Sequence, residues 1–263
     1  MMIMMRTKLL KPKKSLGQNF LMHQRVAERI AAAARLSPRD TVLEIGPGTG
    51  MLTRELLRRA RKVIAIEADG ELFEKLRIDF AHEIAENRLE LRHGDIRTFD
   101  TATLPKGYVL VANIPYYLTG EIFRMFLESD VQPRSLTLLV QKEVAERIAR
   151  AKKESILSLS VKAYGVPTYE FTVVRGAFVP MPKVDSAVLS VRDISRKNFM
   201  TRADELRFFA LLHAGFAHKR KFARKNITEA GFSADGIPEK ARAEDLVLAH
   251  WLALCAQQGK YRA

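Results

Sequence analysis

The chain has 263 residues, of which 47% are hydrophobic, and its 44 lysines and arginines against 30 acidic residues give a formal net charge of +14. This length suits one catalytic domain with a small second domain, and the charge favours a polyanionic partner, nucleic acid or an anionic membrane surface. The single cysteine, Cys255, excludes an internal disulfide framework and a cysteine zinc site, and the histidines lack metal-ligand spacing, so no metal is expected. The chain shows neither a secretory apolar core nor a run near the roughly 20 apolar residues of a membrane span, so a cytoplasmic protein with no membrane partner is expected.

The N-terminal part reads as an arm, a loop and a helix. Residues 6–14 are basic and contain Pro12, which indicates an extended arm. The stretch SLGQNFL, residues 15–21, is broken by Gly17 and has Phe20 and Leu21 as an apolar anchor, and its simplest interpretation is a loop that packs on the next helix. Residues 23–36 are alanine-rich and amphipathic and predict a helix that ends at Ser37-Pro38.

A glycine-rich turn at residues 42–50, VLEIGPGTG, predicts a nucleotide-binding α/β sheet. An apolar strand precedes the glycines, and residues 51–60 follow with helical periodicity. The spacing is GxGxG, which differs from the GxGxxG of dinucleotide sites. The next strand, 62–67, ends in Glu67, where a carboxylate can accept both ribose hydroxyls. A cofactor with ribose but no pyrophosphate fits best, and S-adenosylmethionine is such a cofactor.

The following elements bring polar residues to the same sheet edge. Residues 71–85 predict a helix, and the strand at 88–93 leads to Asp95. Asp95 either accepts a hydrogen bond from an adenine amino group or caps the next helical segment. Residues 108–112 predict a buried strand, and it delivers the sequence Asn-Ile-Pro-Tyr, residues 113–116.

This Asn-Ile-Pro-Tyr stretch fits methyl transfer to the amino group of adenine. That nitrogen is a poor nucleophile because its lone pair is delocalised, and carbonyl acceptors would favour the attacking geometry. Asn113 offers a side-chain carbonyl, Ile114 or Pro115 a backbone carbonyl, and Tyr116 a face on which a flipped base stacks. The alternative is a strand-end turn with an aromatic side chain that only packs.

The rest of the chain completes the sheet and adds helices. Helices are predicted at 121–129 and 155–165, a strand and a helix at 135–149, and two last strands within 169–192 around a linker at 178–182. This gives about seven strands in a domain that ends at Asp193. Residues 194–263 read as a small all-helical domain, with helices at 206–227 and 244–255.

One segment of this helical part, residues 218–225, mixes aromatic side chains with dense positive charge. It is either a solvated face or a phosphate-binding surface, and the net charge favours phosphate. The residues expected to bind RNA are Lys219, Arg220, Lys221, Arg224 and Lys225.

Several motifs in this order resemble the ribosomal RNA adenine dimethyltransferase family, and its kasugamycin-resistance branch in particular. They are SLGQNFL, EIGPGTG, IEAD, GDI, NIPYY and FVPMPKVDSAV, followed by the basic stretch GFAHKRKFARKNI. The resemblance covers about residues 13–230. It implies a seven-stranded, Rossmann-like class I methyltransferase domain at 1–193, with a helical rRNA-binding domain at 194–263. It also implies a monomer that dimethylates the N6 amino groups of two adjacent adenosines near the 3′ end of small-subunit rRNA, within an assembling small subunit.

The resemblance also implies roles for individual residues. S-adenosyl-L-methionine would be bound by Asn19, Leu21, Gly46, Glu67, Asp95 and Asn113. Catalysis and base binding would involve Asn113, Ile114, Pro115, Tyr116 and Phe178. Ala112 and the Leu118-Thr119-Gly120 sequence depart from the family pattern, and they are expected to lie behind the pocket.

Three other functions compete with this interpretation. The first is a large-subunit rRNA adenine methyltransferase of the erythromycin-resistance type, which the long basic C-terminal part disfavours. The second is a non-catalytic ribosome-assembly factor on the same fold, which the presence of Glu67, Asp95 and Asn113 disfavours. The third is a nicotinamide oxidoreductase, against which the GxGxG spacing argues.

Overall fold

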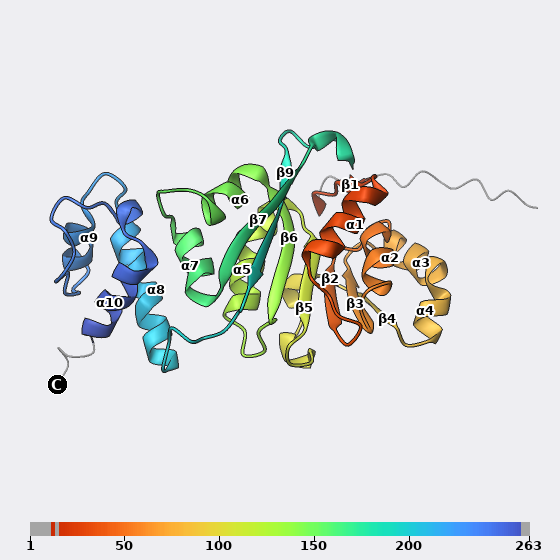
Figure 1. Cartoon of the computed structure of the whole chain (residues 1–263), viewed down its shortest axis with the longest axis horizontal. Helices are drawn as coiled ribbons and strands as arrows, with labels where there is room; N and C mark the ends of the chain where they lie inside the picture. Colours follow the sequence, from red (N-terminus) through yellow and green to blue (C-terminus); the bar gives the residue numbers. More distant parts are fainter. Residues whose placement is uncertain (1–11, 14–15, 259–263) are drawn as a thin grey trace, which may run out of the picture.

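A seven-stranded sheet forms the centre of the molecule (Figure 1). The structure is a computed structural model, and it describes residues 12–13 and 16–258. The predicted basic arm at 6–14 therefore lies almost entirely outside the described residues. The strand order is β4-β3-β2-β5-β6-β9-β7. The strands are β2 (Thr41–Ile45), β3 (Lys62–Glu67), β4 (Leu89–His93), β5 (Val109–Asn113), β6 (Ser135–Gln141), β7 (Val166–Val173) and β9 (Ser186–Arg192).

Among these seven strands, β9 alone runs against the others. β4, β3, β2, β5 and β6 pair in parallel in that order, whereas β9 runs antiparallel to both β6 and β7, so β7 has the same direction as the parallel strands. Because parallel strands end at one edge, the residues that follow β2, β3, β4 and β5 meet there. The predicted seven-stranded Rossmann-like sheet is confirmed.

Helices cover both faces of the sheet, since side chains of successive strand residues point to opposite faces. In β5, Val109 and Val111 pack with helices α1, α2 and α3, whereas Leu110 and Ala112 pack with α5, α6 and α7. The helices are α1 (Gln24–Ala33), α2 (Met51–Leu57), α3 (Gly70–Asp79), α4 (Ala81–Ala85), α5 (Thr119–Leu127), α6 (Lys142–Ala149) and α7 (Ile156–Tyr164). The single helix predicted at 71–85 is thus two helices, which separate at the fully buried Phe80.

Two very short strands join distant parts of the chain above the sheet edge. β1 (Phe20–Leu21) pairs antiparallel with β8 (Phe178–Val179), so Leu21 lies opposite Phe178. The segments predicted as a loop at 15–21 and a linker at 178–182 are therefore partly a two-stranded ladder.

The C-terminal part is helical, and it lies at the opposite end of the molecule from α3 and α4 (Figure 1). It contains α8 (Arg202–Phe216), α9 (Ala223–Glu229) and α10 (Leu248–Gln258). The helix predicted at 206–227 is interrupted by a turn, and the helix predicted from 244 begins at Leu248. One hydrophobic core runs from the sheet through α7 into these helices, where Phe208 and Trp251 are fully buried. Among the residues that the structure describes, no helix combines the length and apolar character needed to cross a membrane.

Candidate active site

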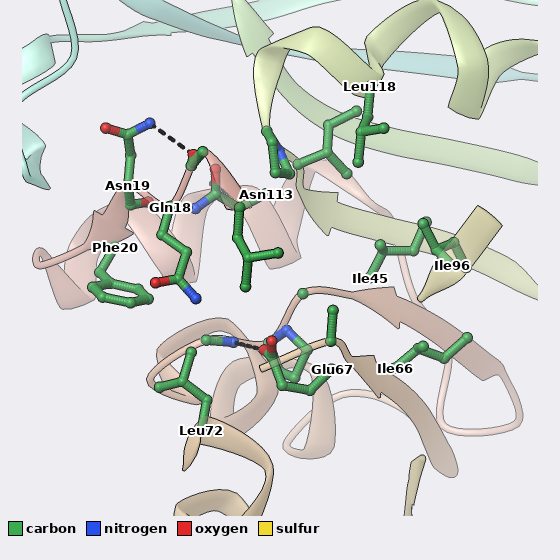
Figure 2. A pocket seen from close by; sticks show the side chains of 18 of the residues that line it. Gln18, Asn19, Phe20, Ile45, Ile66, Glu67, Leu72, Ile96, Asn113 and Leu118 are labelled. Atoms are coloured by element: carbon green, nitrogen blue, oxygen red, sulfur yellow. Dashed lines mark hydrogen bonds between the residues drawn. The ribbon is translucent and has the colours of Figure 1, made fainter. Parts of the chain in front are cut away.

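A pocket lies at the carboxyl edge of the parallel strands, and most predicted cofactor and base residues line it. Figure 2 shows Glu67 and Leu72 at the bottom of this pocket and Gln18, Asn19 and Phe20 on the left. The isoleucines at 45, 66 and 96 lie on the right. The predicted residues that line it are Asn19, Leu21, Gly46, Glu67, Asp95, Asn113, Ile114, Pro115, Tyr116 and Phe178. The structure therefore brings together residues that the chain separates by up to 159 positions, from Asn19 to Phe178.

The glycine turn after β2 forms one wall, and its glycines have different roles. Gly46 has φ 65°, and a Cβ there would meet only the Asn113 carbonyl, at 3.9 Å, so this position stays open. At Gly50 a Cβ would lie 2.5 Å from the Phe80 ring, so close packing requires glycine there. Gly46 thus serves the pocket, and Gly50 serves the packing of α2 on α3.

Glu67 sits at the end of β3 and is 4% exposed. Its Oε2 accepts the Gly48 N–H at 3.0 Å, which is the dashed line to Glu67 in Figure 2. Its Oε1 accepts the Asp69 N–H at 2.9 Å. Burial raises the pKa of this carboxyl group, and these backbone donors oppose that rise. Glu67 is therefore a structural support for the glycine turn as well as a carboxylate in the pocket.

Deeper in the same wall, Glu44 is 1% exposed, and its Oε2 has no hydrogen-bond partner within the described chain. Burial raises its pKa to about 8, and the nearby charge of Glu67 adds to this effect. A buried carboxyl oxygen without a partner is costly unless a ligand or water satisfies it. Glu44 lines the pocket, so this oxygen is available to a polar ligand there.

Asp95 follows β4, and its carboxylate already has partners. Its Oδ1 accepts the Arg97 N–H at 2.9 Å, and its Oδ2 pairs with the Arg97 guanidinium at 2.5 Å. The hydrogen bonds from Arg97 lower the pKa of Asp95. Asp95 therefore caps the short helical turn that follows it, which was one of the two predicted roles. It also lines the pocket, and its binding to adenine stays a prediction.

Asn113 ends β5, and the N-terminal segment fixes its side chain. Its Nδ2 donates to the backbone carbonyl of Asn19 at 3.2 Å, which leaves the side-chain oxygen for another partner. The Asn19 side chain turns away and donates to the Gly17 carbonyl at 3.2 Å (Figure 2). Asn19 thus orients Asn113 through its backbone, a contact that the sequence did not reveal.

The residues after Asn113 form a short 3-10 turn that presents Tyr116. The Pro115 carbonyl accepts the Leu118 N–H at 3.0 Å, so the Ile114 carbonyl is the freer acceptor of the two predicted. The Tyr116 hydroxyl forms a hydrogen bond of 2.7 Å with Oγ of Ser186, which is fully buried at the start of β9. Leu118 lines the pocket (Figure 2), so the expectation that it lies behind the pocket was wrong.

Asp69 and Ser186 are two functional positions that the sequence interpretation missed. Asp69 accepts Lys13 Nζ at 2.6 Å and Gln18 Nε2 at 3.0 Å, so it ties the N-terminal segment across the pocket. It also caps α3 through the Glu71 N–H at 3.0 Å. An Asp directly before a helix was a readable capping signal, whereas nothing local marked Ser186.

The predicted RNA-binding residues lie far from this pocket, in the turn between α8 and α9 and on α9. Lys219, Arg220 and Arg224 are exposed and form no ion pair with another described residue. Lys221 and Lys225 both face Glu229, at 3.0 and 3.9 Å. The free positive charge is therefore smaller than the sequence indicates.

Comparisons with known proteins agree with this geometry. The family model described as ribosomal RNA adenine dimethylase matches residues 9–256. The chain belongs to this family. As a ribosomal RNA adenine dimethylase it is a methyltransferase that uses S-adenosylmethionine.

Several relatives are similar over most of their length. A ribosomal RNA small subunit methyltransferase A from Dehalococcoides mccartyi is 40% identical over 97% of this chain and 91% of its own, and one from Fusobacterium nucleatum is 36% identical over 87% of both chains. A dimethyladenosine transferase from Plasmodium falciparum has a TM-score of 0.78 at 27% identity, with 92% of this chain and 98% of that chain covered. The 23S rRNA methyltransferase ErmE has a TM-score of 0.75 at 28% identity, with coverages of 92% and 100%.

The pocket of this dimethylase fits its cofactor by the chemistry of its walls. Carboxylates stand at the ends of β2 and β3, the glycine turn leaves space at Gly46, and apolar side chains of Ile66 and Ile96 flank the carboxylates. The described residues contain no group of three or more His, Cys, Asp or Glu side chains that could hold a metal ion.

Proposed function

We propose that this dimethylase methylates the N6 amino groups of two adjacent adenosines near the 3′ end of small-subunit rRNA, in an assembling small subunit. One observation supports it above others: Asn113 and Tyr116 are both fixed at the pocket mouth, by Asn19 and Ser186 respectively. A flipped adenine needs both an amide acceptor and an aromatic face. The curated relatives at 36–40% identity are named small subunit methyltransferases, which favours the small subunit.

In this proposal, cofactor binding is the task of Glu67 and Asp95, with Gly46 and the N-terminal residues Asn19 and Leu21 around them. Glu67 would accept the ribose hydroxyls, and Asp95 would accept the adenine amino group in exchange for part of its pairing with Arg97. Leu21 is held opposite Phe178 by the β1–β8 ladder, so both apolar side chains stay at the pocket. S-adenosylmethionine supplies an activated methyl group when bound.

The target base would be held by Asn113, Ile114, Tyr116 and Phe178. The Asn113 oxygen and the Ile114 carbonyl would accept the two amino hydrogens and orient the nitrogen lone pair for in-line attack. The bound cofactor would supply the methyl group to this nitrogen and would leave as the thioether, and the amino proton would pass to solvent. Most of the acceleration would come from positioning, because a sulfonium needs no further activation.

RNA affinity would come mainly from the helical part. We assign residues 1–193 to the methyltransferase domain and 194–263 to an rRNA-binding domain, with a monomer as the working form in the cytoplasm. The exposed Lys219, Arg220 and Arg224 would bind phosphates, with Lys221 and Lys225 contributing once they leave Glu229.

The decisive experiment incubates the full-length protein with methyl-labelled S-adenosylmethionine and either undermethylated small subunits or large subunits. We expect label on two adjacent adenosines of small-subunit rRNA, located by mapping of the modified bases. Label confined to large subunits would establish the erythromycin-resistance type of activity instead. A protein that binds the cofactor in a titration but labels neither subunit would be an assembly factor.

A further inference from the structure

Two consecutive tyrosines stand at the pocket mouth in opposite environments. Tyr116 is partly buried and its hydroxyl is bonded to Ser186, whereas Tyr117 is 61% exposed. Both line the same pocket. The proposed function uses Tyr116 and leaves Tyr117 without a role, although an exposed aromatic ring at the mouth of an RNA-modifying site is a natural stacking surface.

The position of the Tyr117 ring is set by the N-terminal segment. A Cβ at Gly17 would lie 3.0 Å from Cε1 of Tyr117 and 3.2 Å from Cβ of Pro115. The ring therefore packs by one edge on the backbone of Gly17, and the next residue, Leu118, is buried. A ring that is held in this way loses little conformational entropy when a base stacks on it.

A guanidinium group shares the pocket with this ring. Arg97 lines the same pocket, and its side chain is 52% exposed. The hydrogen bond and charge of Asp95 raise the pKa of Arg97, and Glu121 and Tyr117 act in the same direction over a longer range. Tyr117 and Arg97 line the same pocket, so this pocket holds an exposed aromatic ring together with a guanidinium that is paired with Asp95. Bases and phosphates of single-stranded RNA bind to such pairs.

We propose that the Tyr117 ring is a second stacking platform, which binds the base of the nucleotide next to the adenosine in the pocket. This inference rests on the proposed function. Adjacent nucleotides are covalently joined, so a base inserted beside Tyr116 leaves its neighbour at the mouth. The next residue of the turn, Tyr117, presents its exposed ring there. The neighbouring base stacks on the face of the Tyr117 ring, whereas the Asn113 side chain accepts a hydrogen bond from the amino group of the target base.

The test uses small subunits reconstituted with rRNA that carries one target adenosine. The nucleotide on its 5′ side, or in a second set on its 3′ side, is either guanosine, with a large stacking face, or uridine, with a small one. Single-turnover methylation and subunit affinity are measured for the wild-type protein, Tyr117→Ala and Tyr117→Phe. Melting temperature and cofactor affinity are recorded for each protein as readouts that a purely structural change would move.

We expect the wild-type protein to prefer guanosine over uridine on one side of the target. Tyr117→Ala should weaken the affinity for the guanosine substrate by about 5- to 100-fold, the range for one lost base–aromatic stack. It should also remove the preference, with cofactor affinity unchanged, and Tyr117→Phe should retain the preference. The side that shows the effect gives the direction of the RNA strand across the mouth.

A wild-type preference that survives in Tyr117→Ala, or no preference on either side, would overturn the platform while leaving the methyltransferase activity in place. Failure of the wild-type protein to methylate any of these subunits would instead overturn the proposed function. The two failures are therefore distinguishable in one experiment.

Discussion

The pocket and the helical end of the molecule each bury a carboxylate almost completely, and they treat it in opposite ways. Glu205, at the start of α8, is 1% exposed and accepts a hydrogen bond from the Tyr164 hydroxyl. It also pairs with Arg202 at 2.6 Å and Arg196 at 3.2 Å. Glu44, which lines the pocket, is equally buried. Among the described residues it forms no ion pair, and its Oε2 accepts no hydrogen bond.

The two carboxyl groups differ in pKa accordingly. Burial alone would raise the pKa of Glu205, but the Tyr164 hydroxyl and the two arginines lower it, so the carboxylate stays charged. The pKa of Glu44 rises to about 8 by burial. The charge of Glu205 is neutralised by arginines of the same chain, and this carboxylate stabilises the junction between α7 and α8. Glu44 lacks such partners, and an unsatisfied acidic group in a pocket marks a place where a ligand can bind.

The sharpest separation of the two regions is expected from Asn113→Ala. Methylation at saturating cofactor should fall by about 100- to 1,000-fold, the scale for one lost positioned hydrogen bond in catalysis. RNA affinity should change little, because phosphate contacts dominate it. The matched control is Asn198→Ala, which removes a bond of 2.7 Å to the Ala163 carbonyl outside the pocket. It should cost stability and leave the rate intact; wild-type rates in Asn113→Ala would remove this stretch from the active site.

At the helical end, Glu205→Ala should destabilise the protein by about 3 kcal/mol, since it leaves buried and half-buried donors without their acceptor. Urea denaturation of the ligand-free protein measures this loss. Cofactor affinity should not move, because Glu205 does not line the cofactor pocket. An unchanged unfolding free energy would show that Arg196 and Arg202 do not need this carboxylate, and the contrast with Glu44 would lose its basis.

The pH dependence of stability should reveal Glu44. Its pKa is raised in the folded state, so its contribution is fully present below the unfolded value and is lost as the pH rises towards about 8. Between about pH 6 and pH 8 the unfolding free energy of the wild-type protein should fall by about 2–3 kcal/mol relative to Glu44→Gln. Urea denaturation over this pH range measures the difference. Glu143→Gln, at an exposed position of α6, should run parallel to the wild type; a parallel Glu44→Gln curve would mean that Glu44 is ionised throughout.

Glu67→Ala should weaken binding of S-adenosylmethionine by about 1–3 kcal/mol, because buried hydroxyls lose a charged acceptor. Calorimetric titration measures this effect. The Gly48 and Asp69 N–H groups also lose their acceptor, so some stability should be lost as well. Glu67→Gln keeps one acceptor oxygen and should lie between the two proteins. If both variants bound the cofactor as the wild type does, Glu67 would support the turn and nothing more.

The smallest effect is expected at the basic turn. Replacing Lys219 and Arg220 with alanine should flatten the salt dependence of rRNA binding by roughly 0.7–0.9 log units per lost phosphate contact. The control replaces Lys75 and Arg77 on α3, at the other end of the molecule, and removes the same charge (Figure 1). Equal slopes for the two double variants would make the turn an ordinary solvated face. Cofactor affinity should be the same in both.

The sequence predicts the sheet well because β2, β3, β5 and β6 are largely apolar on both faces, while β4 alternates apolar and polar residues, as a half-buried strand does. It does not predict the β1–β8 ladder, since each of these strands has two residues and its partner lies far along the chain. The break between α8 and α9 was also missed, because lysine and arginine favour helices. That turn is held by tertiary contacts of the buried Asn226, which donates to the carbonyls of Gly215 and His218 at 2.7 and 3.1 Å.

In the candidate site, too, local sequence patterns were predictable and contacts between distant segments were not. Glu67, Asp95 and Asn113 could be placed from the sequence because each directly follows or ends a strand. The groups that orient the reactive side chains could not be placed, since the Asn19 carbonyl that fixes Asn113 and the Ser186 hydroxyl that fixes Tyr116 come from distant segments with no local signal. Sequence patterns therefore locate reactive groups, whereas their orientation depends on how distant segments pack.

The position of β9 in the sheet makes the assembly of the pocket depend on the order of synthesis. β9 lies between β6 and β7 in the sheet but follows both in the chain, so β7 has no partner strand until β9 has left the ribosome. The first residue of β9 is Ser186, whose hydroxyl fixes Tyr116. A nascent chain that stops before this strand has every residue of the Asn-Ile-Pro-Tyr stretch but no means of locking its aromatic ring. Addition of the last strand to the sheet thus supplies the hydroxyl group that fixes the side chain of Tyr116.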